Sequence, residues 1–366
     1  MTVSQDAAAN IRDKLATYID PYLGQTLAQV NAIESVSVHR NGARVELKFG
    51  FPCADYGPEL LPLLASFLER ELGGVPLELQ LRAEITSHAV QRTLKPLSHV
   101  KNIVAVASGK GGVGKSTTAA NLALAWAAQG ARVGLLDADI YGPSQPQMMG
   151  LADAKPETTD GKHILPLRAH GVEVMSIGFL IDAEQPMVWR GPMVTQALTQ
   201  LLGETSWGQL DYLVVDMPPG TGDIQLTLAQ RVPVSGAIIV TTPQDIALLD
   251  ARKGLKMFEK VEVRVLGVVE NMSIHICSEC GHAEHIFGSG GGARMAEQYG
   301  VQLLGELPLD IRIREEADGG LPTVAADPGS ARALAYRLMA RRAAARLATL
   351  NKDYSSVFPK ITVEST

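Results

Sequence analysis

The sequence predicts an α/β protein in which a parallel sheet, covered by helices on both faces, follows a small α+β domain. Three observations support this prediction. From residue 103 onward, short continuous apolar runs alternate with helix-like stretches, a pattern typical of parallel strands buried on both faces. A glycine-rich loop, GKGGVGKS, lies between one such run and a helical stretch. The first 90 residues instead contain short strands in which apolar and polar residues alternate.

Length and composition set limits on the class of protein. The 366 residues suffice for two domains, and 46% of them are hydrophobic. The net charge of −6 argues against a basic nucleic-acid binder, and no apolar run reaches the roughly 20 residues of a spanning helix. The N-terminus lacks the basic and apolar regions of a secretory signal, and three cysteines do not make a secreted disulfide framework. We therefore expect a cytoplasmic protein that binds neither nucleic acid nor a membrane.

Residues 1–90 are predicted to form the small α+β domain. Asn41-Gly42 lies between two alternating stretches and indicates a hairpin. Cys53 is the one candidate for a reactive group here, and we interpret it as a half-buried structural cysteine. We expect helices over 7–22 and 60–72, the second ended by Gly73-Gly74, and strands over 36–38, 45–49 and 77–81.

A polar segment, residues 91–102, is predicted to link this domain to a second domain over 103–350. Ligands of parallel sheets bind at the carboxyl ends of the strands, so functional residues should follow the apolar runs. Five arginines among alanines and leucines favour a helix docked on the surface over 330–350, with a membrane-surface helix as the alternative. Residues 351–366 are a C-terminal tail, expected to be disordered toward its end. The apolar runs are IVAVAS, VGLLDAD, VEVMSIG, YLVVD, AIIVTT and VLGVVEN.

The glycine-rich loop fits the P-loop pattern G-x-x-x-x-G-K-[ST]. Its glycines let the backbone turn tightly and aim N–H groups at phosphates, and the helix N-terminus adds positive potential. Lys115 would reach the β- and γ-phosphates, the Ser116 hydroxyl would hold Mg²⁺, and Thr117 would contact another phosphate. A second glycine run, GSGGG at 288–292, has no lysine after it and is predicted to be a flexible connection into a helix. The predicted nucleotide-binding residues are Gly109, Lys110, Gly111, Gly112, Val113, Gly114, Lys115, Ser116 and Thr117.

Three aspartates follow predicted strands and suit a magnesium-nucleotide site. Asp216 ends the run YLVVD, where a Walker B aspartate reaches Mg²⁺ directly or through water. We expect Asp139 to orient or deprotonate the attacking water and Asp137 to support the metal shell. Gly220, in the turn after Asp216, can direct a backbone N–H toward the γ-phosphate. For each aspartate alone, the alternative is a helix cap or a loop turn.

KGGVGKST carries Lys110 in addition to Lys115, and it resembles the deviant Walker A motif of the SIMIBI class of P-loop NTPases. That class includes the MinD and ParA partition ATPases, the nitrogenase iron protein and the arsenite-pump ATPase. The resemblance implies a MinD-like fold and an ATP-dependent homodimer in which Lys110 reaches the nucleotide of the partner subunit. It also implies that Asn271 contacts the adenine, with a strand-end cap as the alternative, and that the segment from Pro308 covers the base. Lys110, Lys115 and Asp139 are the expected catalytic residues.

The pair Cys277 and Cys280 is open to three interpretations. With His282 and His285 it supplies four zinc ligands, although all four lie within nine residues and enclose no finger domain. It could be a redox CxxC, but it does not follow the strand–helix context of a thioredoxin motif. Alternatively, two such pairs from two subunits share one [4Fe–4S] cluster, which takes four thiolates.

The strings DADIYGPS, DMPPGTGD, VENMS and CSECGHAEHIFGSGGG together resemble the Mrp/ApbC family of iron–sulfur cluster carrier proteins over essentially the whole chain. The resemblance implies the shared cluster, with supporting or structural roles for His282 and His285. It implies slow ATP hydrolysis, delivery to apo iron–sulfur proteins, and an iron–sulfur-assembly-type small domain. The alternatives are a MinD/ParA-like positioning ATPase and an ATP-gated electron-transfer protein.

Overall fold

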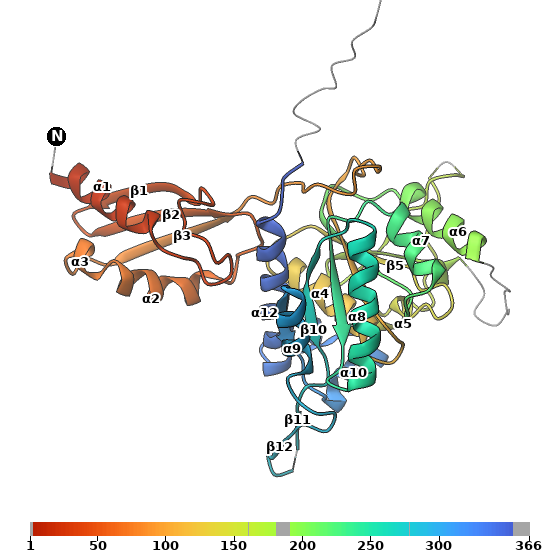
Figure 1. The fold of residues 1–366 in the computed structure, drawn as a ribbon. Coiled ribbons are helices and arrows are strands. Elements are labelled where there is room, and N and C mark those ends of the chain that lie inside the picture. Colours follow the sequence, from red (N-terminus) through yellow and green to blue (C-terminus); the bar gives the residue numbers. More distant parts are fainter. Residues whose placement is uncertain (1–2, 160, 181–190, 278, 354–366) are drawn as a thin grey trace, which may run out of the picture.

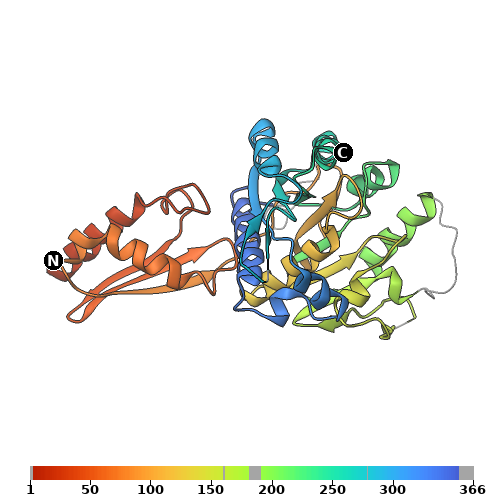
Figure 2. The ribbon, with the colours of Figure 1, turned by 90° about the horizontal axis from the view of Figure 1, so that it is seen from below.

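The computed structural model describes residues 3–159, 161–180, 191–277 and 279–353, and Figures 1 and 2 show two views of its ribbon. The strands are β1 (Ile33–His39), β2 (Gly42–Phe49), β3 (Leu77–Ala83), β4 (Val100–Ser108), β5 (Val133–Asp137), β6 (Leu167–Ala169), β7 (Val172–Ser176), β8 (Leu210–Asp216), β9 (Gly236–Thr241), β10 (Val265–Glu270), β11 (His275–Ile276), β12 (Ala283–Glu284) and β13 (Gln302–Glu306).

The helices are α1 (Val3–Ala16), α2 (Gly57–Phe67), α3 (Glu69–Leu72), α4 (Lys115–Ala128), α5 (Gln145–Met148), η1 (Ile177–Phe179), α6 (Gly191–Glu204), α7 (Asp223–Arg231), α8 (Asp245–Lys260), α9 (Gly291–Tyr299), α10 (Ile311–Asp318), α11 (Thr323–Ala326) and α12 (Ala331–Ala348). Among the described residues, no helix is both long and apolar enough to cross a membrane.

The small domain is a three-stranded sheet, β1–β2–β3, with α1 packed against β1 and α2 packed against β3. The predicted hairpin is confirmed, because β1 and β2 pair antiparallel across His39 and Gly42. The predicted helix over 7–22 is wrong at its end: α1 stops at Ala16, and the Asp20 carboxylate accepts the backbone N–H groups of Tyr22 and Leu23 in the following turns. The helix expected over 60–72 is divided between α2 and α3 at Leu68.

The second domain contains an eight-stranded sheet in the order β13-β10-β9-β4-β8-β5-β7-β6, in which only β6 runs antiparallel to its neighbour. This arrangement confirms the predicted parallel α/β fold, and each predicted apolar run coincides with one of its strands. β4 lies between β9 and β8, so the loop after β4 is flanked by the ends of those two strands. The carboxyl ends of the parallel strands therefore gather the loops that the sequence analysis singled out.

Helices cover both faces of this sheet (Figure 2). α4 packs against β4, β5 and β8, and α12 packs on α4. α8 packs against β9 from the other face, next to α7 and α9. The predicted docked helix is confirmed as α12, because Trp126 of α4 donates its indole N–H to the Ala340 carbonyl at 2.8 Å and buried residues line the helix.

α12 lies beside the small domain (Figure 1). It holds that domain through a group of side chains that we call the interdomain seam: Tyr22, Asp55, Glu59, Arg337 and Arg341. Arg341 is buried and forms ion pairs with Asp55 at 2.7 Å and Glu59 at 2.6 Å. Arg337 pairs with the same Asp55. Two of the five arginines that suggested a membrane-surface helix, Arg337 and Arg341, thus face carboxylates of the small domain.

The segment expected to be a linker is fixed to the second domain. Gln91 is buried, and its side-chain nitrogen donates to the Ala229 carbonyl at 2.7 Å while its oxygen accepts from Val234 N at 3.0 Å. Val100 already begins β4. Just before this segment, His88 pairs in an antiparallel bridge with Lys352, which follows α12 near the C-terminal end of the second domain. The disorder expected toward the end of the tail concerns residues 354–366, which lie outside the described residues.

Candidate functional site

The P-loop, residues 109–116, joins β4 to α4 and is held in shape by its neighbours. Gly109 packs so closely on α8 that a Cβ would overlap the backbone of Asp250. Gly114 has φ of +80°, which favours glycine, and a Cβ there would overlap the side-chain nitrogen of Asn271. These contacts fix the position of the loop, and Gly111 and Gly112 are exposed to solvent.

Lys115 lies inside this loop and neutralises the strand-end carboxylates. Its ammonium is 2.5 Å from Asp216 Oδ1, 3.0 Å from the Ser116 hydroxyl and 4.0 Å from Asp139 Oδ2. Lys115 and Asp216 are both buried. The structure therefore brings together three of the predicted nucleotide and magnesium residues, Lys115, Ser116 and Asp216, with Asp139 beside them.

Asp137 is completely buried and is bonded to the loop that follows β5. It accepts hydrogen bonds from Asp139 N at 3.1 Å, Gln145 N at 3.0 Å and the Ser176 hydroxyl at 3.2 Å. Burial, and then the negative charge of Asp216, raises the pKa of Asp137 to about 7. The Asp137 carboxylate thus holds the loop that carries Asp139. It supports the site through that loop and makes no described hydrogen bond to Lys115 or Ser116.

Gln145 is a site residue that the sequence analysis missed. Its side-chain nitrogen donates to Asp216 Oδ2 at 2.9 Å and to the Ser116 carbonyl at 3.0 Å, while its backbone N–H bonds to Asp137. It thereby joins the strand ends of β5 and β8 to the P-loop. The only signal in the sequence was its place in the polar loop DADIYGPSQ, six residues beyond Asp139.

Asp139 lies 4.0 Å from the ammonium of Lys115, and Gly220 lies beside the end of β4. Burial raises the pKa of Asp139, and the nearby charge of Lys115 opposes that rise. Gly220 adopts φ of +101°, and its N–H donates to the Ser108 carbonyl at 3.0 Å. In this structure the Gly220 N–H, which we expected to face a γ-phosphate, is therefore bonded to the strand that leads into the P-loop.

The remaining predicted nucleotide residues lie at the rim of the P-loop. The backbone of Lys110 is tied down, because its carbonyl accepts from the Ser108 hydroxyl at 2.8 Å. Within the described residues, its ammonium has no hydrogen-bond or ion-pair partner. Asn271 follows β10 and donates its side-chain N–H to the Val113 carbonyl at 2.9 Å. Thr117 is half-buried in the first turn of α4.

Cys277 and Cys280 lie on a two-stranded projection that we call the CxxC hairpin, residues 273–286, of which Ser278 lies outside the described residues (Figure 1). Gly281 N donates to the Cys277 carbonyl at 2.9 Å, which closes the turn between the two cysteines. Cys277 is half-buried and Cys280 exposed. Hydrogen bonds from the backbone N–H groups of Cys280 and then Glu279, followed by one from the Cys280 side chain, lower the pKa of Cys277.

The four-ligand zinc hypothesis finds no support within one chain. Among the described residues, no three His, Cys, Asp or Glu side chains converge as a metal site. The His285 ring is oriented through its Nδ1, which lies 2.6 Å from the Ser273 carbonyl. Cys53, the third cysteine, is buried in the small domain, and burial raises its pKa to about 12. The two thiols of the hairpin are thus the accessible sulfur ligands among the described residues.

The glycine run at 288–292 is not a flexible connection. Gly291 begins α9, and a Cβ on it would lie 2.6 Å from the Leu248 side chain and 2.9 Å from the Pro243 carbonyl oxygen. A Cβ on Gly292 would lie 2.9 Å from the Glu270 side chain, and Glu270 accepts a hydrogen bond from Gly292 N. These glycines permit close packing of α9 on α8 and β10, so the end of the hairpin is anchored.

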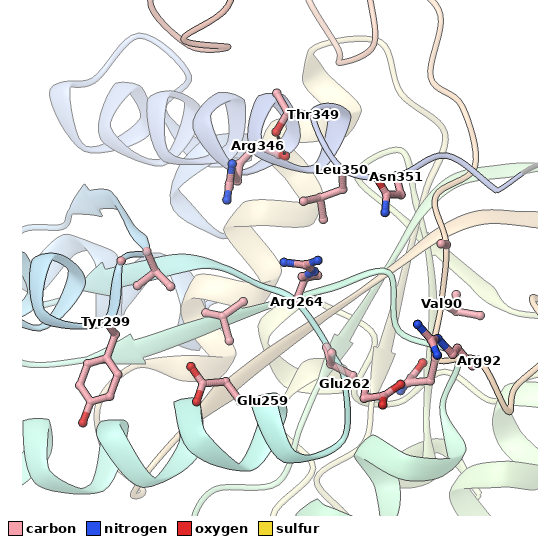
Figure 3. Close-up of a pocket in the computed structure, with 16 residues that line it drawn as sticks. Val90, Arg92, Glu259, Glu262, Arg264, Tyr299, Arg346, Thr349, Leu350 and Asn351 are labelled. Atoms are coloured by element: carbon pink, nitrogen blue, oxygen red, sulfur yellow. Dashed lines mark hydrogen bonds between the residues drawn. The ribbon is translucent and has the colours of Figure 1, made fainter.

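A cavity of about 810 Å³ lies near the amino ends of the parallel strands, whereas the P-loop lies at their carboxyl ends. Figure 3 shows α12 with Arg346 on one side of it, and α8 with Glu259 on the other. Arg264, just ahead of β10, also lines it, which places it at the amino ends of the strands. This cavity therefore does not belong to the nucleotide site.

Comparisons with known proteins agree with this geometry. A family model described as ParA, NUBPL iron-transfer P-loop NTPase, matches residues 99–344. An iron-sulfur cluster carrier protein of Escherichia coli (strain K12) is 52% identical over 339 residues, spanning 93% of this chain and 92% of that protein. Another, of Pseudomonas fragi, is 64% identical over 264 residues, spanning 72% of this chain and 92% of that protein. A solved nucleotide-binding protein from Archaeoglobus fulgidus, in complex with ADP and with cobalt, is 39% identical, with a TM-score of 0.55, covering 61% of this chain and 88% of that one.

Proposed function

This chain belongs to the NUBPL iron-transfer P-loop NTPases, a family of iron–sulfur cluster carriers, and from that membership we propose that it is an ATP-hydrolysing carrier of a [4Fe–4S] cluster. Two copies of the chain hold the cluster between them and pass it to apo-proteins in the cytoplasm. The observation that carries this proposal is the CxxC hairpin: it has two accessible thiols, one of lowered pKa, and among the described residues no group of three metal ligands includes them. A [4Fe–4S] cluster takes four thiolates, so a second copy supplies the other pair.

Anaerobic reconstitution with iron and sulfide tests this proposal. The wild-type protein should take up about four iron and four sulfide per two chains, as the cluster type requires. The Cys277→Ser, Cys280→Ser double variant should take up almost none. Cys53→Ala is the matched control, because Cys53 is buried in the other domain, and it should load as the wild type does. A normal iron and sulfide content in the double variant would contradict the proposal.

The nucleotide chemistry follows from the charges around Lys115. In this structure Lys115 neutralises Asp216, so the arrival of phosphates gives the ammonium a new anionic partner and leaves the carboxylate free for Mg²⁺. Ser116 supplies a hydroxyl ligand for the metal, and Asp139 is positioned to orient the attacking water. Asp137 and Gln145 hold these groups in place without touching the phosphates. We expect slow hydrolysis, suited to a switch between two states.

The homodimer is supported by surface features beside the P-loop. α8 lies against Gly109 and exposes Ile246 and Leu249, which are 69% and 54% accessible. Ile276 and Ile286 of the CxxC hairpin are also exposed. Burying such side chains between two copies would be favourable, and it would bring the unpartnered ammonium of Lys110 toward the nucleotide of the partner subunit.

A Lys110→Ala variant tests the dimeric site. It should bind a nucleotide with wild-type affinity, because Lys115 remains, while ATP turnover falls by roughly 100-fold or more, as for loss of one transition-state charge partner. Turnover and nucleotide affinity are measured on the same preparation, together with its mass in solution with and without ATP. Normal turnover in this variant would remove the support for a site completed by a second copy.

A further inference from the structure

The segment that follows β13 runs along the first arm of the CxxC hairpin. Ser273 N donates to the Leu307 carbonyl at 2.9 Å, and Leu309 N donates to the Ile274 carbonyl at 2.8 Å. The Ser273 hydroxyl adds a third bond, to the same Leu307 oxygen at 3.1 Å. The hairpin therefore extends the pairing of β10 with β13 beyond the sheet, and it shares a ladder with residues 307–309.

Two histidine rings complete this attachment. Nδ1 of His275 lies 3.0 Å from the Leu309 carbonyl, and Nδ1 of His285 lies 2.6 Å from the Ser273 carbonyl. Because a carbonyl oxygen only accepts, Nδ1 must carry the hydrogen in each ring. His275 thus joins the first arm to residues 307–309, and His285 joins the second arm to the first. The cysteine turn lies between these two fastenings.

The base of the hairpin also reaches the nucleotide site. Asn271, two residues before Ser273, donates its side-chain N–H to the Val113 carbonyl of the P-loop at 2.9 Å. Met272 between them has φ of +57°, in the left-handed region that a methionine rarely adopts, so the turn from β10 into the hairpin is tightly defined. A displacement of the P-loop or of residues 307–310 therefore has a short, bonded route to the hairpin.

We propose that His275 and His285 are positioning residues that make the cysteine turn follow the nucleotide state of the P-loop. This inference rests on the proposed function and adds its means of regulation. A nucleotide that displaces Asn271 or residues 307–310 moves the base of the ladder, and the two rings transmit that movement to both arms. Without the rings, the described bonds between the arms are the short pairing of β11 with β12 and the two bonds of the Cys277 backbone, to His282 and Gly281.

Amide hydrogen exchange of the cluster-free protein tests the inference. With Mg²⁺ and a non-hydrolysable ATP analogue, the wild type should change its exchange both at 307–312 and at 275–285. In the His275→Ala, His285→Ala variant, the response at 307–312 should remain while that at 275–285 falls by about five-fold or more, as expected when a locally opening unit loses its tether. His282→Ala is the matched control, because among the described residues His282 bonds through its backbone carbonyl, which accepts from Cys277 N, and it should respond as the wild type does.

Asparagine variants separate positioning from general loss of structure. In His275→Asn, His285→Asn the side-chain N–H stands where the Nδ1–H of histidine stands, so the response at 275–285 should return. The inference is overturned if the change in exchange at 275–285 is equal in the wild-type and alanine proteins. It is also overturned if the nucleotide causes no change in exchange at 275–285 in the wild type. An asparagine protein that stays uncoupled while 307–312 responds also overturns it. Failure of the proposed function would appear separately, as wild-type protein that takes up no iron or sulfide.

Discussion

The P-loop and the CxxC hairpin both follow the carboxyl ends of parallel strands, β4 and β10, but they are built in opposite ways. Lys115, Asp137 and Asp216 are buried, and each makes at least one charge-assisted or backbone hydrogen bond. Cys277 and Cys280 lie on a projecting two-stranded element, and Cys280 is exposed. The first region is a closed network of fixed charges, whereas the second presents two ligands to its surroundings.

This difference matches what each region is proposed to do. Buried charges keep their geometry and interact strongly because water does not screen them, which suits a site that must recognise the same phosphates in every cycle. A cluster that is to be handed over needs ligands that a recipient can approach. The contrast between a buried and an exposed region can be tested directly, and four measurements do so.

The largest expected difference is in the reactivity of the cysteines. Burial raises the pKa of Cys53 to about 12, so at pH 8 only about one molecule in 10⁴ carries the thiolate. The pKa of Cys277 is lowered and its thiol is accessible. Iodoacetamide at pH 8 should therefore modify Cys277 rapidly and leave Cys53 unmodified, as followed by mass spectrometry of peptides. In denaturant all three cysteines should react, and rapid labelling of Cys53 in the native protein would contradict its burial.

The two lysines of the P-loop should differ in their effect on stability. Lys115→Ala leaves Asp216 buried without its partner, so the free energy of unfolding of the nucleotide-free protein should fall by about 3–5 kcal/mol. Lys110→Ala should change it by less than about 0.5 kcal/mol, because the Lys110 ammonium contacts no other described residue. Urea denaturation of both variants measures this. Similar losses in the two proteins would show that the Lys115–Asp216 pair is not a buried ion pair in solution.

The third difference concerns pH. The pKa of Asp137 is raised from its ordinary value of 3.8 to about 7, so the folded protein binds this proton more tightly than the unfolded chain does. The contribution of Asp137 to the free energy of unfolding therefore falls as the pH rises from 3.8 to about 7, and it is constant above that. Relative to the wild type, Asp137→Asn should become steadily more stable over this range. A difference that does not change with pH would argue against the raised pKa.

The smallest effect on stability is expected at Gly291, where the chain leaves the CxxC hairpin and enters α9. Gly291→Ala places a methyl group against Leu248 and Pro243, and overpacking of this kind costs about 1–3 kcal/mol. Gly329→Ala is the matched control, because nothing lies within 4 Å of a Cβ at that position. Thermal unfolding compares the two variants. If Gly291→Ala were as stable as the control, the return of the chain into α9 would be looser than the structure shows.

The sequence predicted the parallel sheet and the P-loop because both depend on local patterns. The runs that became β4, β5, β8, β9 and β10 are apolar throughout, and a P-loop has a fixed spacing. Gln145 could not be predicted, because a glutamine in a loop becomes a site residue only when two other strand ends approach it. The end of α1 was missed for a similar reason: Asp20 bonds to the backbone of the turn and to the Tyr56 hydroxyl, a contact over 36 positions.

The contacts that attach the CxxC hairpin to the rest of the domain could not be predicted from the sequence either. The glycines at 291 and 292 look like a flexible run, but their lack of a side chain is what admits Leu248 and Glu270. The resemblance implied a supporting or structural role for His285, but the carbonyl oxygens that the His275 and His285 rings approach are visible only in the structure. In both cases, the partner that decides the role comes from a distant part of the chain.

The interdomain seam determines which charged side chains are exposed when the two domains are produced separately. Residues 87–89 and 351–353 pair with each other, so the two ends of the ATPase domain meet at one place and the domain can be excised as a cassette. A fragment over 87–353 keeps this clasp but uncovers Arg337 and Arg341, whose carboxylate partners belong to the small domain. Replacing both arginines with glutamine gives the cassette a neutral surface there. Conversely, the small domain produced alone exposes Asp55 and Glu59, whose arginine partners remain on α12.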